Sequence, residues 1–361
     1  MSTSGPHNPC MPSTIDALFG IELPIIQAPM AGAQGSAMAA AVSAAGGLGS
    51  LPAAMLTTEG LRREIGELRA RTDRPFNVNF FCHEPPSFDA ARDAAWRARL
   101  APYYDELGVA RDAEPSGPAR EPFSAEMASV IEELRPPVVS FHFGLPEESL
   151  LERVRRTGAK ILSSATTVEE ARWLAERGVD AVIAQGVEAG GHRGMFLTGD
   201  MTTQLGTFAL LPQIVDAVRV PVIAAGGIAD ARGVAAAFDL GAAGVQAGTA
   251  YLLCPESTIS PVYRAALQSE AAAHTAVTNV ITGRPARGIV NRIIRELGPL
   301  RDDLPPFPLA TPTVMPLRAA AEARGSGDFS PLWSGQNASH CRPVPAAEVT
   351  RELAKGWLRR S

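Results

Sequence analysis

The sequence predicts an α/β fold: a (β/α)8 barrel of the TIM type with a small, mostly helical insertion and C-terminal lid domain. Three observations support this. Short apolar runs alternate with helical patterns from Pro24 onward, these runs number eight, and 361 residues are enough for one large barrel with insertions. Hydrophobic residues make up 46% and charged residues 20% of the chain, which is typical of a globular protein and not of a disordered one.

The eight predicted strands are short apolar runs bounded by turn residues. They cover residues 24–28, 48–51, 76–80, 138–142, 160–163, 180–184, 221–225 and 244–247. Helical patterns lie between them at 58–71, 147–157, 168–177, 211–218 and 231–240. Glycine follows several of these helices, as expected for helix C-termini. Strands joined by helices in this way predict a closed parallel sheet.

Two segments do not follow the strand–helix repeat. We therefore predict a barrel formed by residues 15–82 and 136–255, an insertion at 83–135, and a helical lid or C-terminal segment at 256–361. Within the last segment, helices are expected from Pro261, near 317–324 and near 346–360. We expect these helices to cover the mouth of the barrel.

The charge balance argues against polyanionic partners. Net charge is −5, from 33 basic and 38 acidic residues without a basic run, so neither nucleic acid nor a membrane surface is expected as a partner. No run of 18 apolar residues and no signal peptide is found.

The four cysteines form no CxxC pair, which predicts a reduced, cytoplasmic protein without a zinc site. With only two lysines, P-loop and Schiff-base chemistry is disfavoured.

Catalytic residues of such barrels lie where the strands end, because the eight following loops meet on one face. The first strand ends at Pro29 and Met30, where backbone N–H groups can lie beside a flat ligand. In the third strand, alternation directs Asn77 and Asn79 to the barrel interior, where buried amides need partners. The alternatives are that Pro29 merely ends a strand and that the two amides belong to the core.

Two histidines lie at the predicted mouth. His142 ends the fourth strand, and His192 lies between glycines in the loop after the sixth. The glycines let this loop approach a ligand closely, so we predict His192 to be a general base. For His142 a purely structural, hydrogen-bonded role is an equal alternative. The remaining histidines show no metal-ligand spacing, and no metal site is expected; they are His7, His83, His274 and His340.

Glycine-rich turns follow the last two strands. Gly226 and Gly227 come after the seventh strand, and Gly248 and Thr249 after the eighth. Turns at these places form the usual phosphate site of such barrels, through backbone N–H groups and a helix N-terminus. No GxGxxG that opens a βαβ unit, Walker loop or GxSxG elbow competes with this interpretation.

Taken in order, these segments resemble the nitronate monooxygenase family, formerly 2-nitropropane dioxygenases, and within it the first of two bacterial and fungal classes. The likeness is strong over residues 15–295 and looser in the tail, which includes Leu332-Trp-Ser-Gly-Gln336. The matching segments are Pro24-Ile-Ile-Gln-Ala-Pro-Met30, Phe76-Asn-Val-Asn79, Ser140-Phe-His-Phe-Gly144, Gln185 to Gly194, Ala224-Ala-Gly-Gly-Ile228 and Gln246-Ala-Gly-Thr249.

The resemblance implies an FMN-dependent enzyme that converts alkyl nitronates or nitroalkanes with O2 into a carbonyl compound and nitrite. It implies that His192 is the catalytic histidine, that His142 is a second active-site histidine, and that the FMN phosphate lies on Gly227, Gly248 and Thr249. A homodimer is one open arrangement. The full set implied to bind FMN is Pro29, Met30, Asn77, Asn79, Gln185, Gly190, Gly191, Gly226, Gly227, Gln246, Gly248 and Thr249.

The tail departs from the family pattern. Where the family has a Tyr-Pro-Phe-Val-Tyr-Asp-Ala-Thr-Lys-like segment, this chain has Phe307-Pro-Leu-Ala-Thr-Pro-Thr-Val-Met315. Phe307, Thr311 and Met315 thus replace a tyrosine, another aromatic residue and a lysine. This predicts a more apolar, less cationic pocket and a bulkier or neutral substrate, unless Phe123 or the pair Tyr103–Tyr104 compensates for the missing tyrosines.

Two alternative functions remain open at this point. One is an FMN-dependent NAD(P)H:quinone or enoyl-thioester reductase on the same barrel, which fast anaerobic bleaching by NAD(P)H would favour. The other is a flavin- or phosphate-binding barrel without catalysis, in which replacing His192 would change only stability.

Overall fold

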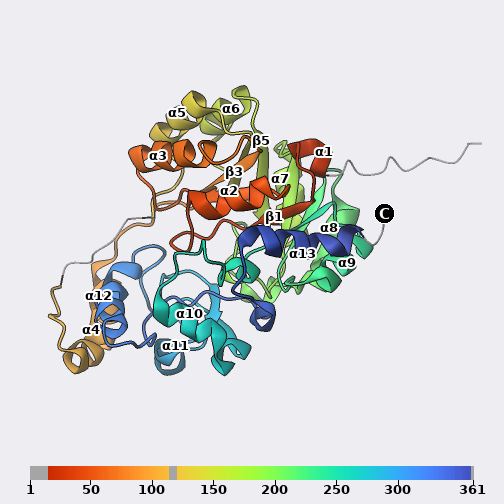
Figure 1. The fold of residues 1–361 in the computed structure, drawn as a ribbon. Coiled ribbons are helices and arrows are strands. Elements are labelled where there is room, and N and C mark those ends of the chain that lie inside the picture. The colour runs from red at the N-terminus through yellow and green to blue at the C-terminus, as the bar shows by residue number, and fades with distance from the viewer. Residues whose placement is uncertain (1–14, 114–119, 359–361) are drawn as a thin grey trace, which may run out of the picture.

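The computed structural model describes residues 15–113 and 120–358, and Figure 1 shows their arrangement. Eight parallel strands follow one another around a closed sheet in the order β1-β9-β8-β6-β5-β4-β3-β2. A parallel bridge between Ile26 and Leu48 joins the first and last of these and closes the barrel. The strands are β1 (Ile25–Gln27), β2 (Gly49–Pro52), β3 (Phe76–Phe81), β4 (Val138–His142), β5 (Lys160–Ala165), β6 (Ala181–Gln185), β8 (Val222–Ala225) and β9 (Gly244–Ala247). The predicted eight-stranded barrel is confirmed.

A ring of helices covers the barrel. Side chains cap several of their N-termini: the Thr57 hydroxyl accepts from the Gly60 N–H, and the Asp230 carboxylate accepts from Arg232 and Gly233. The ring comprises α2 (Ser36–Ala44), α3 (Thr58–Arg69), α5 (Ala125–Leu134), α6 (Glu148–Arg156), α7 (Val168–Glu176), α8 (Thr207–Ala217), α9 (Ala231–Asp239) and α13 (Ala346–Leu358).

The position of α13 differs from the predicted lid. This helix packs against α9 and α2 on the outside of the barrel (Figure 1). Contact with α9 is so close that a Cβ at Gly356 would lie 2.1 Å from the Ala231 carbonyl oxygen. The reason is the apolar face of α13, with Val349, Leu353 and Ala354 buried in the barrel core cluster. The helix therefore fills the eighth place in the ring, after β9, although about a hundred residues intervene.

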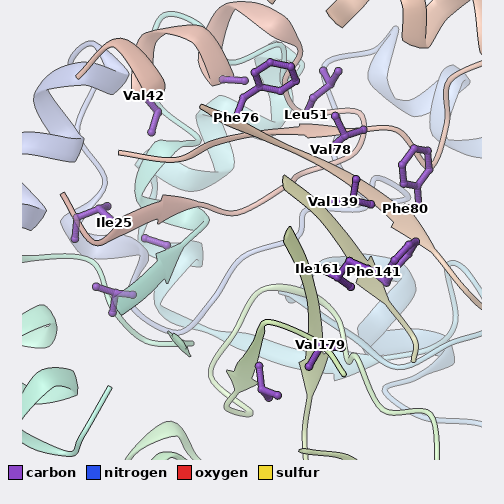
Figure 2. Packing of buried hydrophobic residues seen from close by; sticks show 14 of the residues in the cluster. Ile25, Val42, Leu51, Phe76, Val78, Phe80, Val139, Phe141, Ile161 and Val179 are labelled. Atoms are coloured by element: carbon purple, nitrogen blue, oxygen red, sulfur yellow. The ribbon is translucent and has the colours of Figure 1, made fainter. Parts of the chain in front are cut away.

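Alternation along the strands divides the core into two layers. Phe76, Val78 and Phe80 of β3 pack outward against the helices (Figure 2), whereas Asn77 and Asn79 are buried polar residues between them. A second apolar layer fills the barrel interior near its amino end, where α1 (Ile15–Phe19) is packed. The amino end is thus closed by apolar side chains, which leaves the carboxyl ends of the strands for a site.

A second group of elements lies beside that carboxyl end. Helix α4 (Ala90–Leu107) of the insertion packs against α12 (Thr311–Glu322), and α10 (Pro261–Gln268) and α11 (Arg292–Leu297) lie near them (Figure 1). Apolar side chains from the insertion and the C-terminal segment form a separate core there. Segments far apart in the sequence therefore build one body over the barrel mouth.

This body also contains an antiparallel sheet that the sequence did not predict. Its strands are β10 (Thr275–Thr278), β11 (Ala286–Ile289) and β7 (Gly191–His192), in the order β10-β11-β7. Pairing of His192 with Ala286 ties the histidine loop to the C-terminal segment. No helix within the described ranges is long and apolar enough to span a bilayer.

Candidate active site

A cavity of about 350 Å³ lies at the carboxyl ends of the strands. Of the predicted site residues, all but Asn77 line it; they are Pro29, Met30, Asn79, His142, Gln185, Gly190, Gly191, His192, Gly226, Gly227, Gln246, Gly248 and Thr249. The parallel strands of a barrel all end on one face, which explains why residues more than two hundred positions apart meet here.

The two asparagines of β3 occupy different depths. Asn77 lies below the cavity, where its amide nitrogen donates to the hydroxyls of Ser50 (3.0 Å) and Ser140 (2.8 Å). Asn79 lies one step nearer the mouth and donates to the hydroxyl and the carbonyl of Ser140 (2.9 and 3.2 Å). Asn77 therefore does not line the cavity, whereas Asn79 does.

The histidine loop is held by side chains of two strands. The carbonyl oxygen of His192 accepts from Nε2 of His142 (3.2 Å) and from the amide nitrogen of Gln185 (3.0 Å). Gln185 in turn accepts from the Gly194 N–H (2.8 Å). Since His142 ends β4 and Gln185 ends β6, the barrel itself fixes the backbone that carries His192.

These contacts define the protonation of His142. A carbonyl oxygen only accepts hydrogen bonds, so Nε2 carries the proton, and Nδ1 accepts from the Ser164 hydroxyl at 3.1 Å. Burial, with positive charge from Arg284 and Arg193, lowers the pKa of His142 to about 3. The ring is therefore neutral at physiological pH and serves to position the loop.

This lowered pKa predicts a pH-dependent stability. The unfolded chain takes up a proton on this histidine below about pH 6.5 while the folded chain does not, so the free energy of unfolding should fall as pH drops from about 6.5 toward 3. One such group contributes at most about 1.4 kcal/mol per pH unit. Between about pH 4.5 and 7, the free energy of unfolding measured with urea should change less steeply with pH in His142→Gln than in the wild type. The control is His274→Gln, at an exposed histidine, which should follow the wild type. An equal change of the free energy of unfolding with pH in all three proteins would contradict a lowered pKa of His142.

His192 lies among aromatic rings at the cavity wall. Its ring centroid is 5.1 Å from that of Phe307, 5.6 Å from Trp333 and 6.0 Å from Phe143. Burial, followed by the positive charge of Arg120, lowers the pKa of His192 well below its usual value. The imidazole is therefore neutral at physiological pH.

Thr282 determines which nitrogen of His192 is available. The Thr282 hydroxyl lies 3.3 Å from the Arg284 carbonyl, to which it donates, and 3.0 Å from Nε2 of His192. The hydroxyl oxygen thus accepts a hydrogen bond from Nε2–H, which leaves the lone pair of Nδ1 as the basic position. His192 lines the cavity, and this tautomer is compatible with the predicted role of general base.

The other charged residues of the loop hold its shape. Glu188 accepts from the Thr207 backbone (2.8 and 3.0 Å) and hydroxyl (2.8 Å), so it caps α8. Arg193 is fully buried and donates to the carbonyls of Gln185 and Gly186, both at 2.7 Å. Neither lines the cavity; of the motif Glu188-Ala-Gly-Gly-His-Arg-Gly194, the residues that line it are Ala189, Gly190, Gly191 and His192.

The glycine turns present donors to the cavity. Gly227 has φ +71°, a conformation that favours glycine, and its N–H and that of Gly248 donate to no other group in the described part of the chain. The Oε1 atom of Gln246 is buried without a partner. Unpaired N–H groups suit a phosphate, and the amide oxygen suits an N–H or O–H donor, so this donor set fits a nucleotide-type cofactor such as FMN.

The tail closes this side of the cavity. The Gly335 N–H donates to the Thr249 hydroxyl and the Asn337 amide donates to the Gly227 carbonyl, each at 2.9 Å. A Cβ at Gly190 would lie 2.5 Å from the Gly335 nitrogen, so the two glycines allow this approach. The segment around Leu332-Trp-Ser-Gly-Gln336 therefore belongs to the mouth.

Several cavity residues were missed from the sequence. Tyr263 and Trp333 bring aromatic rings, and the Tyr263 hydroxyl donates to the Trp333 carbonyl. Tyr103 and Tyr104 lie elsewhere, in the core shared by the insertion and the C-terminal segment, and Phe123 packs in the barrel core. Trp333 could have been found from its place in the tail segment Leu332-Trp-Ser-Gly-Gln336, whereas no local sequence pattern indicates that Tyr263 is a cavity residue.

The three tail substitutions have different outcomes. Phe307 packs against His192, with 5.1 Å between ring centroids, but it does not line the cavity, and neither do Thr311 and Met315. The cavity does carry positive charge, because Arg120 and Arg318 line it. Arg120 comes from the insertion and Arg318 from α12, so a residue-by-residue comparison of the tail could not reveal both.

Together, the closed parallel barrel and the cofactor-sized cavity at its mouth define an enzyme of the (β/α)8-barrel class. The chain belongs to the nitronate monooxygenase family, whose model matches residues 13–356. It is 44% identical over 342 residues to the nitronate monooxygenase of Paraburkholderia phytofirmans, covering 94% of this chain and 93% of that one.

Two solved structures share this fold over almost the whole chain. The nitroalkane oxidase of Streptomyces ansochromogenes is 39% identical with a TM-score of 0.87, over 97% of this chain and 100% of that one. FabK of Thermotoga maritima is 29% identical with a TM-score of 0.69, over 96% of each chain. The predicted family and the predicted enzyme class, nitronate monooxygenase, are confirmed, and the family is flavin-dependent.

Proposed function

We propose that this chain binds FMN in the cavity and, with O2, converts alkyl nitronates into a carbonyl compound and nitrite. The observation that carries the proposal is the pairing, in one cavity, of a neutral His192 with unpaired donors at Gly227 and Gly248. Bound FMN would supply the one-electron chemistry that oxidation by O2 requires.

The residues proposed to hold FMN divide by chemistry. Gly227, Gly248 and Thr249 would bind the phosphate through backbone N–H groups, with Gly226 shaping the turn. The unpaired Oε1 of Gln246 would accept from the cofactor. The remaining proposed contacts are Pro29, Met30, Asn79, Gln185, Gly190 and Gly191, which line the same cavity.

His192 has two roles in this proposal. Its Nδ1 lone pair can take the α-proton of a neutral nitroalkane, but a lowered pKa makes the imidazole a weak base. A nitronate has already lost that proton and needs only a site that accepts its negative charge. The geometry therefore favours preformed nitronates over neutral nitroalkanes, and the surrounding rings of Phe307, Trp333 and Phe143 keep water from the reacting groups.

A two-armed experiment separates this function from the reductase alternative. Purified protein with bound flavin is mixed with propyl-1-nitronate in air, following O2 uptake and nitrite release, and separately with NADH or NADPH under anaerobic conditions, following the flavin absorbance. We expect nitrite release with the nitronate and no rapid bleaching by the nucleotides. Rapid bleaching by NADH or NADPH without nitrite release from the nitronate would favour the reductase. No reaction in either arm would favour the non-catalytic barrel.

The proposed cellular setting follows from the thiols. The described cysteines Cys82, Cys254 and Cys341 are free, which fits the reducing cytoplasm. The partners we propose are a small nitronate and O2, and the homodimer stays a prediction.

A further inference from the structure

A second cavity, of about 1240 Å³, lies beside the active-site cavity, and the two share no lining residue. Aromatic rings separate them. Phe307 lines the second cavity, and its ring centroid is 5.1 Å from that of His192, which lines the first. Phe143 of the second cavity likewise lies 4.9 Å from Phe81 of the first. The second cavity is therefore distinct from the site proposed to hold the cofactor.

The lining of the second cavity suits a flat, uncharged ligand. Aromatic rings and prolines contribute much of it, among them Phe143, Phe307, Trp173, Pro122, Pro285 and Pro306. Such surfaces bind planar rings well, because ring contacts add to the gain from burial of apolar area. The charged residues of the lining are two arginines and three exposed glutamates, Arg177, Arg284, Glu84, Glu147 and Glu148. This balance does not favour an anion.

His83 contributes an unpaired acceptor to this cavity. The residue is 6% exposed, and its Nδ1 has no hydrogen-bond partner among the described residues. The hydrogen bond from its ring to the Arg120 backbone is therefore made by Nε2, which carries the proton because a carbonyl only accepts. Burial, followed by the positive charge of Arg284, lowers the pKa of His83 to about 4. The ring is thus neutral at physiological pH, with a lone pair on Nδ1.

Arg284 contributes an unpaired donor near His83. Its guanidinium lies over the Phe143 ring, 3.9 Å from the ring centroid, and its Nη2 donates to the Met195 carbonyl. Its Nε, in contrast, is buried without a partner in the part of the chain that the structure describes. A buried donor and a buried acceptor each cost free energy while they stay unpaired. A ligand that pairs with both recovers this cost.

A carboxamide carries the complementary pair of groups in one plane. Its oxygen accepts from an N–H such as Nε of Arg284, and its N–H donates to a lone pair such as that on Nδ1 of His83, whereas a carboxylate has no proton to donate. We propose that the second cavity is a binding site for a small, uncharged aromatic carboxamide, held by His83 and Arg284 with its ring against Phe143 and Phe307. This site is separate from the proposed reaction and does not depend on it.

The test compares three probes on the wild-type protein as purified, with binding followed by calorimetry. Benzamide should bind with a Kd of about 1 mM or less. N,N-dimethylbenzamide keeps the ring and the carbonyl but has no N–H, so it should bind at least about tenfold more weakly. Equal binding of the two amides, or no binding of benzamide, would overturn the proposal. Tighter binding of benzoate than of benzamide would also overturn it, because the cavity would then recognise an anion.

A substitution then locates the bound amide. His83→Phe keeps a flat ring without Nδ1, so it should bind benzamide at least about tenfold more weakly and no longer distinguish the two amides. The control is His274→Phe, at an exposed histidine outside both cavities, which should bind as the wild type does. Unchanged benzamide binding in His83→Phe would place the ligand elsewhere and overturn the proposal. If His83→Phe does not fold, the comparison of the two amides on the wild type still decides the question.

Discussion

His192→Asn should slow turnover of neutral nitroalkanes by about 10²–10⁴-fold while slowing preformed nitronates by no more than about tenfold. Removal of the α-proton needs a base, and His192, which lines the cavity, has its free lone pair on Nδ1. Asparagine offers an amide in its place, which can still hydrogen-bond to Thr282 but takes up no proton. Steady-state kcat/KM for nitroethane and for ethyl nitronate, measured on the same preparation, gives the comparison.

The control for this substitution is His274→Asn, because His274 is an exposed histidine outside the cavity. Its kinetics should match those of the wild type, and flavin content should be equal in all three proteins. Losses of equal size on nitroethane and ethyl nitronate in His192→Asn would mean that His192 does not abstract the proton.

The sequence predicted the barrel because its signals are local. Alternation in Phe76-Asn-Val-Asn-Phe80 separates the layer that packs on helices from the layer inside the barrel, and glycine turns mark where strands end. Once eight strands close into a barrel, their ends must meet, so the position of the cavity follows from the topology alone.

The features that the sequence did not predict depend on contacts between distant segments. Nothing within 346–360 indicates that this helix packs on α9 and α2 and not over the mouth, and the pairing of His192 with Ala286 joins two-residue and four-residue strands without a clear pattern. Arg193 shows the opposite difficulty. A charged residue in a glycine-rich motif resembles a catalytic group, but it donates to the backbone carbonyls of Gln185 and Gly186.

The cavity therefore has two origins. The barrel supplies the glycine turns and fixes the backbone of His192 through His142 and Gln185. The insertion and the C-terminal segment supply Arg120, Arg318, Tyr263 and Trp333. We infer that cofactor binding depends mainly on the barrel and substrate choice mainly on the second body.

Gly227→Asp should remove the cofactor almost completely, and this is the most direct test of the barrel half of the site. A carboxylate about 4 Å from a phosphate, at an effective dielectric constant of about 20, costs about 4 kcal/mol, which weakens binding about a thousandfold. Gly227→Asn introduces a side chain of the same shape without the charge, at a φ of +71° that asparagine tolerates better than most residues.

Comparison of Gly227→Asp with Gly227→Asn separates the effect of the charge from the effect of the side chain's shape. A Cβ at Gly227 would lie 3.4 Å from Cβ of Glu188, which is ordinary contact, so both variants should fold. Flavin per protein after gel filtration, and the dissociation constant from titration of the apoprotein with FMN, should be close to the wild type in the asparagine variant, within about tenfold, and lost in the aspartate variant. Equal retention in both would place the phosphate away from Gly227, and equal loss would mean that the turn needs glycine for its conformation and would leave the charge argument without support.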